Sequence, residues 1–117
     1  MISANQLLKH FGSIRAVDGI SFEVARGETF GLLGPNGAGK STTINILSGV
    51  LPPDDGTVQI NGETDPTRSQ VRRQLGLAPQ ALAIYEDLTA RENVHFFGGM
   101  YGLSGTPLKE RANDILD

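Results

Sequence analysis

One segment constrains the fold of this chain more than any other, because residues 34–41 read Gly-Pro-Asn-Gly-Ala-Gly-Lys-Ser. A glycine, four variable residues and then Gly-Lys-Ser match every fixed position of a phosphate-binding loop. The glycines let the backbone curl so that its N–H groups point inward with no Cβ in the way. An apolar segment, residues 29–33, precedes the loop, and a helical pattern follows it. This order of strand, loop and helix predicts an α/β fold that holds the phosphates of a nucleotide.

The residue types in and after this loop suit a triphosphate with a magnesium ion. The N-terminus of the following helix adds unsatisfied N–H groups and a partial positive charge. Lys40 supplies a mobile full charge for the β- and γ-phosphates, and the Ser41 hydroxyl can bind Mg²⁺. We therefore predict ATP and Mg²⁺ as the cofactors. The predicted nucleotide-binding residues of this segment are Gly34, Pro35, Asn36, Gly37, Ala38, Gly39, Lys40, Ser41 and Thr42.

Short strands are predicted around the loop. They are residues 2–8, 16–24, 29–33, 57–60 and 75–78. The second is expected to break at Asp18-Gly19, a dipeptide that favours turns. Residues 29–33 form a continuous apolar run, which is typical of a parallel strand buried on both faces. The N-terminal strands are thus expected to form a mainly antiparallel sheet beside one parallel core strand.

Helices are predicted after each of the later loops. The first runs from about Lys40 to Ser48, and Gly49 stops it. A second is expected to start with Asp65 as its N-cap and Pro66 in its first turn. Thr89 and Glu92 fit a capping box, which predicts a third helix from residue 90. The Thr106-Pro107 dipeptide is expected to begin the last one.

Composition and charge exclude several classes of protein. The 117 residues suffice for one small domain, and the net charge of −3 gives no basic excess for nucleic acid binding. There is no cysteine, and His10 and His95 show no metal-ligand spacing. No apolar run approaches the roughly 18–20 residues that span a bilayer, and no signal-peptide core is visible. We therefore expect a cytoplasmic protein that reaches a membrane only through a partner.

The residues around the loop match more than a generic pattern. Residues 34–42, followed by Thr-Ile-Asn-Ile-Leu-Ser-Gly, closely resemble the Walker A segment of ATP-binding cassette (ABC) transporter ATPases. Residues 17–22 and 56–62 look like two strands of that family, residues 75–80 like its Q-loop entry, and residues 85–93 like the start of its helical subdomain. The resemblance covers essentially the whole chain and is greatest to multidrug or antibiotic exporter subunits.

This resemblance implies a P-loop NTPase fold of the ABC ATPase type that is incomplete. Residues 1–117 are then a single partial nucleotide-binding domain. Residues 1–28 are mainly the antiparallel β-subdomain, residues 29–80 the part of the RecA-like core from the loop to the Q-loop, and residues 81–117 the start of the helical subdomain.

Two further positions gain roles from the resemblance. Phe11 stands where the family places an aromatic ring against adenine, and stacking on a base contributes roughly 1–3 kcal/mol. Gln80 stands at the Q-loop glutamine, whose amide offers an oxygen to Mg²⁺ and an NH₂ group to a phosphate or water. Catalytic roles are accordingly predicted for Lys40 and Gln80, and metal-binding roles for Ser41 and Gln80.

Three family motifs are absent from the 117 residues: the Walker B strand ending in Asp-Glu, the Leu-Ser-Gly-Gly-Gln signature and the switch histidine. Glu86-Asp87 has the reverse order of acids, and the segment Leu103-Ser104-Gly105-Thr106 lacks the second glycine and the glutamine of the signature. Hydrolysis needs a group that orients the attacking water. The resemblance therefore implies a fragment of an ATPase, inactive by itself.

The predicted function is that of an ATP-binding subunit that couples MgATP binding and hydrolysis to transport. Its partners would be a membrane subunit, met through the region after Gln80, and a second nucleotide-binding subunit. Its place would be the inner face of the cell membrane. A non-catalytic nucleotide-binding module and a soluble ABC ATPase without a transporter remain as alternatives. A GTPase is disfavoured because no Asn-Lys-x-Asp guanine reader occurs. The sequence leaves the transported substrate, the direction of transport and the membrane partner open.

Overall fold

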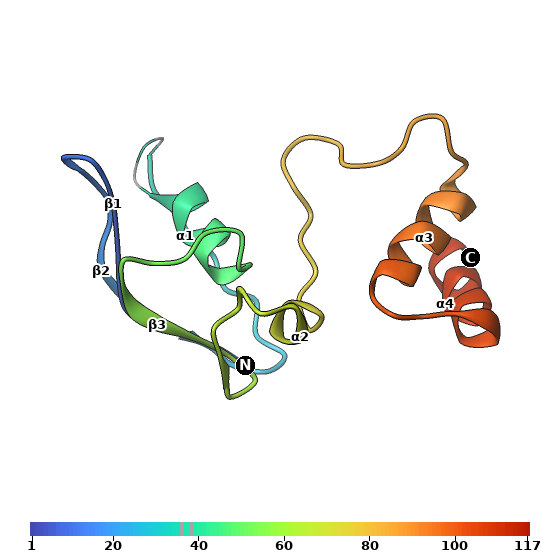
Figure 1. Ribbon diagram of the computed structural model, residues 1–117, viewed down its shortest axis with the longest axis horizontal. Coiled ribbons are helices and arrows are strands. Elements are labelled where there is room, and N and C mark those ends of the chain that lie inside the picture. The colour runs from blue at the N-terminus through green and yellow to red at the C-terminus, as the bar shows by residue number, and fades with distance from the viewer. Residues whose placement is uncertain (36, 38) are drawn as a thin grey trace. The chain divides into compact units, whose positions relative to one another are not determined.

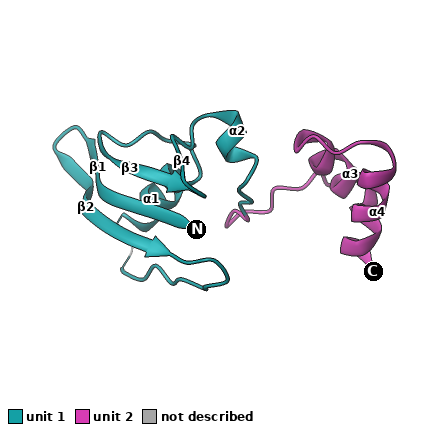
Figure 2. Cartoon of the chain, turned by 90° about the horizontal axis from the view of Figure 1, so that it is seen from below, with its two compact units in different colours: residues 1–77 teal, residues 78–117 magenta. Residues whose placement is uncertain are grey.

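The chain divides into two compact units, residues 1–77 and residues 78–117, which are shown in different colours in Figure 2. The computed structural model describes residues 1–35, 37 and 39–117. Each unit has its own packing, so each is described separately, in the element labels of Figure 1.

The first unit is built on an antiparallel sheet. Its strands are β1 (Ile2–Phe11), β2 (Ile14–Val24), β3 (Asp55–Ile60) and β4 (Glu63–Thr64), in the order β2-β1-β3-β4. The strands predicted at residues 2–8 and 57–60 are confirmed as parts of β1 and β3. The turn predicted at Asp18-Gly19 is wrong, because β2 runs through it. Leu7 pairs with Ile20 and Leu8 with Asp18, so Gly19, at a φ of +74°, is the extra residue of a bulge.

The predicted parallel core strand at residues 29–33 is also wrong. In the described part of the chain these residues form no strand, and Leu33 is 93% exposed. Phe30 instead stacks its ring on Phe22 of β2, with centroids 4.9 Å apart. A parallel strand needs a parallel neighbour to satisfy its N–H and C=O groups, and the strands described are all antiparallel. Residues 75–78, also predicted as a strand, lie outside helices and strands.

The helix after the loop forms as predicted. It is α1 (Lys40–Leu47), capped by Ser48 and followed by Gly49 at a φ of +75°. The next helix, α2 (Ser69–Arg72), does not begin where Asp65-Pro66 predicted. Asp65 has a φ of +65°, and its carboxylate accepts hydrogen bonds from the backbone N–H and the hydroxyl of Thr67. The side chain thus closes a local turn that competes with a helix cap.

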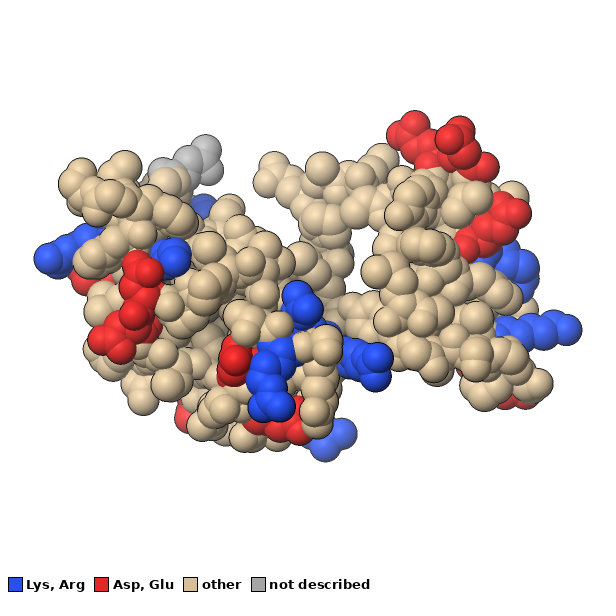
Figure 3. Space-filling model, viewed as in Figure 1, with Lys and Arg blue, Asp and Glu red and all other residues tan. Residues whose placement is uncertain are grey.

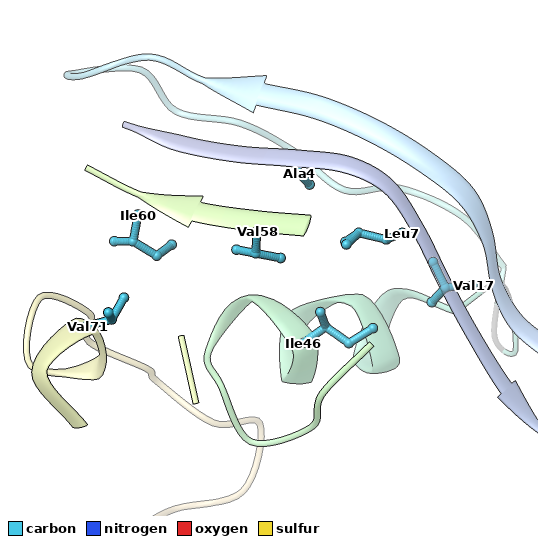
Figure 4. Packing of buried hydrophobic residues seen from close by; sticks show 7 residues of the cluster. All are labelled: Ala4, Leu7, Val17, Ile46, Val58, Ile60 and Val71. Carbon is cyan, nitrogen blue, oxygen red and sulfur yellow. The ribbon is translucent and has the colours of Figure 1, made fainter. Parts of the chain in front are cut away.

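One apolar cluster joins α1 and α2 to the sheet (Figure 4). Its buried members are Ala4, Leu7, Val17, Ile46, Val58, Ile60 and Val71. Side chains alternate between the faces of a strand, so Val58 and Ile60 of β3 lie on the same face. Ile46 from α1 packs there, and this contact fixes the helix, with the loop before it, to the sheet.

The second unit contains two helices, α3 (Ala90–Met100) and α4 (Gly105–Leu116). The predicted capping box is confirmed: the Thr89 hydroxyl accepts from Glu92 N–H, and the Glu92 carboxylate accepts from Thr89 N–H at 2.7 Å. The last helix begins at Gly105, one residue before the predicted start. The two helices enclose a groove of about 380 Å³. Its lining includes the apolar residues Val94, Phe97, Tyr101, Leu108, Ala112 and Ile115.

Substituting the cap residue tests how far α3 depends on it. Thr89→Ala is expected to destabilise the helix by about 1 kcal/mol, because it removes the acceptor for an N–H of the first turn. Faster amide hydrogen exchange in α3 measures the loss. The control is Thr106→Ala, which lies inside the first turn of α4 instead of before it. Equal exchange rates in the two variants contradict the cap assignment.

The same cap predicts a pH dependence. Hydrogen bonds from the backbone N–H of Thr89 and from its side chain hold the pKa of Glu92 below its ordinary value. A depressed pKa means that the carboxylate stabilises α3 above its unfolded-state pKa, and that this stability is lost as the pH falls through the lowered value. The protection factors of the α3 amides, which correct for the intrinsic pH dependence of exchange, should therefore fall on acidification less in Glu92→Gln than in the parent chain. An identical fall contradicts the role of the Glu92 carboxylate.

Candidate nucleotide-binding site

The end of the phosphate-binding loop rests against the sheet. Gly39 precedes α1 in a left-handed conformation, with a φ of +89°. A Cβ atom on this residue would lie 2.1 Å from the carbonyl oxygen of Ala16 in β2 and 3.6 Å from the Val17 side chain. No side chain fits in that space, and glycine also tolerates the positive φ. The sequence thus places a glycine where the loop must touch β2.

Thr43 secures the same end of the loop from the helix side. Its hydroxyl and its backbone N–H both lie 2.8 Å from the carbonyl oxygen of Gly39, and the residue is fully buried. Sequence reasoning did not assign Thr43 a role. The available signal was a hydroxyl residue four positions after Gly39, the spacing at which a helical side chain can bond back to a carbonyl.

Lys40 spans the loop. Its ammonium group donates a hydrogen bond to the carbonyl oxygen of Gly34, at the opposite end of the loop. Gly34, Pro35 and Gly37 are exposed. Asn36 and Ala38, which belong to the predicted binding set, lie outside the described residues.

The first turn of α1 has the electrostatic character of an anion site. It contains no acidic residue, and no side chain caps it. Its N–H groups and the positive end of the helix dipole are therefore available to an anion. Ser41 is exposed and Thr42 is half-buried in this turn. Backbone donors, an ammonium group and a hydroxyl form a donor set that fits a triphosphate with a hard cation.

Phe11 lies at the same end of the sheet as the loop. It is the last residue of β1, and its side chain is 49% exposed. Two residues earlier, Lys9 pairs with Val17, the β2 residue next to Gly39. The sheet therefore brings an exposed aromatic ring and the phosphate-binding loop together, although 22 residues separate Phe11 from Gly34.

Gln80 belongs to the second unit, where it is exposed and lies outside helices and strands. Its predicted part in Mg²⁺ binding and catalysis stays a prediction.

Among the residues that the structure describes, no group of three or more acidic or histidine side chains could hold a metal ion. Nor is any described helix long and apolar enough to cross a membrane. On the face in Figure 3, basic side chains gather on the first unit with acidic ones beside them.

Comparison with known proteins identifies the family. A model described as ABC transporter matches residues 17–117, which is most of the chain. The chain belongs to the ABC transporter family. The family assignment made from the Walker A segment is thus confirmed, and so is the partial ABC ATPase fold with its antiparallel β-subdomain.

Curated ABC relatives include several proteins named for export or resistance. The chain is 44% identical over its whole length to the linearmycin resistance ATP-binding protein LnrL of Bacillus subtilis, and covers 38% of that protein. It is 42% identical over its whole length to the Nod factor export ATP-binding protein I of Ralstonia nicotianae, covering 37% of it. The probable multidrug ABC transporter ATP-binding protein YbhF of Escherichia coli is 43% identical over 95% of the chain, which covers 19% of that relative. The chain thus spans well under half the length of these relatives.

Solved ABC structures agree with the fold. An ATP-binding subunit of an ABC transporter matches 89% of the chain with a TM-score of 0.80 and 34% identity, and the match covers 44% of that subunit. The dimeric structure of MJ0796, a bacterial ABC transporter cassette, matches 99% of the chain with a TM-score of 0.84 and 26% identity, over 54% of its own length.

The contact between Gly39 and β2 can be tested with a matched pair of glycines. Gly39→Ala should cost about 1–3 kcal/mol of stability more than Gly37→Ala, because its added methyl group overpacks against backbone. Both residues have a positive φ, but a Cβ on Gly37 meets nothing within 4 Å. Urea unfolding followed by circular dichroism compares the two variants. Equal midpoints mean that the loop does not press on Ala16.

Proposed function

We propose that this chain binds MgATP as the nucleotide-binding part of an ABC transporter ATPase. The observation that carries the proposal is the first turn of α1. No side chain caps this turn, it has no acidic residue, and it contains Lys40 and Ser41. Such a turn offers N–H groups, a positive dipole end and a full positive charge to one anion. Membership in the ABC transporter family supports the choice of ATP.

Each residue of the site has a distinct proposed task. The Lys40 ammonium leaves the Gly34 carbonyl to contact the β- and γ-phosphates, and the Ser41 hydroxyl binds the metal. The backbone from Gly34 to Thr42, with Pro35, Asn36, Gly37, Ala38 and Gly39, encloses the phosphates. Phe11 stacks on the adenine, and the Gln80 amide contributes an oxygen to Mg²⁺. When bound, ATP supplies the phosphoryl group, and Mg²⁺ neutralises its developing charge.

The family supports a wider proposal about partners. We infer that the region after Gln80 meets a membrane subunit and that the site is completed by a second nucleotide-binding subunit, at the inner face of a membrane. The dimeric cassette among the solved relatives supports the second partner. Relatives named for export, resistance and multidrug transport support an exporter. A non-catalytic nucleotide-binding module is the alternative, favoured by the missing Asp-Glu pair after a buried strand.

Removing the loop lysine tests the nucleotide site. Lys40→Ala should abolish most MgATP binding, because charge-assisted contacts to phosphate are about twice as strong as neutral ones. Isothermal titration of the whole chain with MgATP measures the loss. Lys109→Ala removes an equal charge from α4 and should bind like the parent chain. An unchanged affinity in the Lys40 variant contradicts the proposed site.

We further predict that these 117 residues do not turn over ATP by themselves. Binding the ground state does not lower the barrier unless the transition state is bound more tightly. The chain has no assigned carboxylate to orient the attacking water. A phosphate-release assay, with Lys40→Ala as background, should show no difference between the two. Lys40-dependent phosphate release contradicts this prediction and shows that a residue such as Glu86 or Asp87 serves as the base.

A further inference from the structure

The C-terminal end of β1 has a strand partner on one side only. The pairing of β1 with β3 ends where Leu8 lies opposite Asp55. Beyond that point β1 continues through Lys9 and His10 to Phe11, paired only with β2. An unpaired strand end leaves backbone groups exposed and frays easily. Phe11, the proposed base-stacking residue, stands on this end.

Asp54 bonds to β1 immediately beyond the last residue pair between β1 and β3. Its backbone N–H donates to the carbonyl of Leu8 at 2.8 Å. One carboxylate oxygen accepts from the backbone N–H of His10 at 2.7 Å, and the other lies 3.2 Å from the Lys9 ammonium. One residue thereby contacts three consecutive positions of β1, immediately before Phe11. The side chain replaces the missing strand.

The ion pair extends this restraint to the aromatic ring itself. The Lys9 side chain is only 12% exposed, and its ammonium lies 5.7 Å from the centroid of the Phe11 ring. A cation at that distance is attracted to the ring face. Lys9 thus occupies one face of the ring, and Phe11 remains about half exposed. The hydrogen bond from His10 N–H and the Lys9 ammonium hold the pKa of Asp54 below its ordinary value, so it is charged at neutral pH.

We propose that Asp54 is a positioning residue for base recognition: through His10 and Lys9 it fixes the end of β1 so that Phe11 presents its free face to the base of the nucleotide. This inference rests on the proposed function. It adds to the same site a part that recognises the base, formed by Phe11 and held in place by Lys9 and Asp54. Asp54 does not touch the nucleotide. Its effect is to remove the cost of ordering Phe11 at the moment of binding.

The test separates the base from the phosphates. The whole chain is titrated with MgATP and with magnesium tripolyphosphate, which has neither base nor sugar. Phe11→Ala should weaken MgATP binding roughly 5- to 150-fold, the fold-change for the loss of one stacked base. Asp54→Ala should weaken it roughly three- to tenfold, and in Phe11→Ala it should add little, because coupled residues are not additive. Tripolyphosphate should bind equally to all these variants.

Asp55→Ala is the matched control, because the Asp55 carboxylate bonds only to the backbone N–H of its neighbour Gly56 among the contacts described. It should bind both ligands like the parent chain. Unchanged MgATP binding in Asp54→Ala overturns the proposal, as does an equal loss for both ligands or an additive loss in the double variant. If instead neither ligand's affinity depends on Lys40, the proposed function itself fails, which is a different result.

Discussion

The first unit depends on one close contact between backbones, that of Gly39 with the carbonyl of Ala16. Any side chain at this position would push the start of α1 away from β2. Because no Cβ lies between the two backbones, the helix begins directly against the sheet, and Ile46 reaches the apolar cluster about two turns after Gly39. The loop from Gly34 is therefore closed at its helix end by packing as well as by hydrogen bonds from Thr43.

This contact places the two halves of the proposed site, one for the base and one for the phosphates, at the same end of the sheet. The antiparallel pairing of β1 with β2 carries Phe11 to the end of the sheet where Gly39 lies. The base-side half is shaped by strand pairing and by the carboxylate of Asp54, and the phosphate-side half by the dipole and free N–H groups of α1. The phosphate-side half relies mainly on backbone N–H groups, which explains why glycine and short polar residues dominate residues 34–42.

The parts of the fold that were predictable are those with a local cause. The Gly-Lys-Ser pattern, the stop at Gly49 and the Thr89–Glu92 cap each involve residues within one turn of each other. The errors have non-local causes. Residues 29–33 are apolar enough for a core strand, but a strand forms only beside a partner. Gly19 permits a turn, yet β2 stays paired with β1 on both sides of it, and Gly19 becomes the extra residue of a bulge. The contacts of Asp54 with β1 join positions 44 and 45 residues apart, which no local pattern reveals.

The most direct test of the account is a ¹H–¹⁵N correlation spectrum of the whole chain recorded with and without MgATP. We predict the largest shifts at the amides of Gly37, Gly39, Lys40 and Ser41, because backbone N–H groups bind the phosphates. Magnesium tripolyphosphate should reproduce those shifts, and shifts at the end of β1 near Phe11 should require the base. Shifts confined to the second unit, or no shifts at saturating MgATP, would contradict the account.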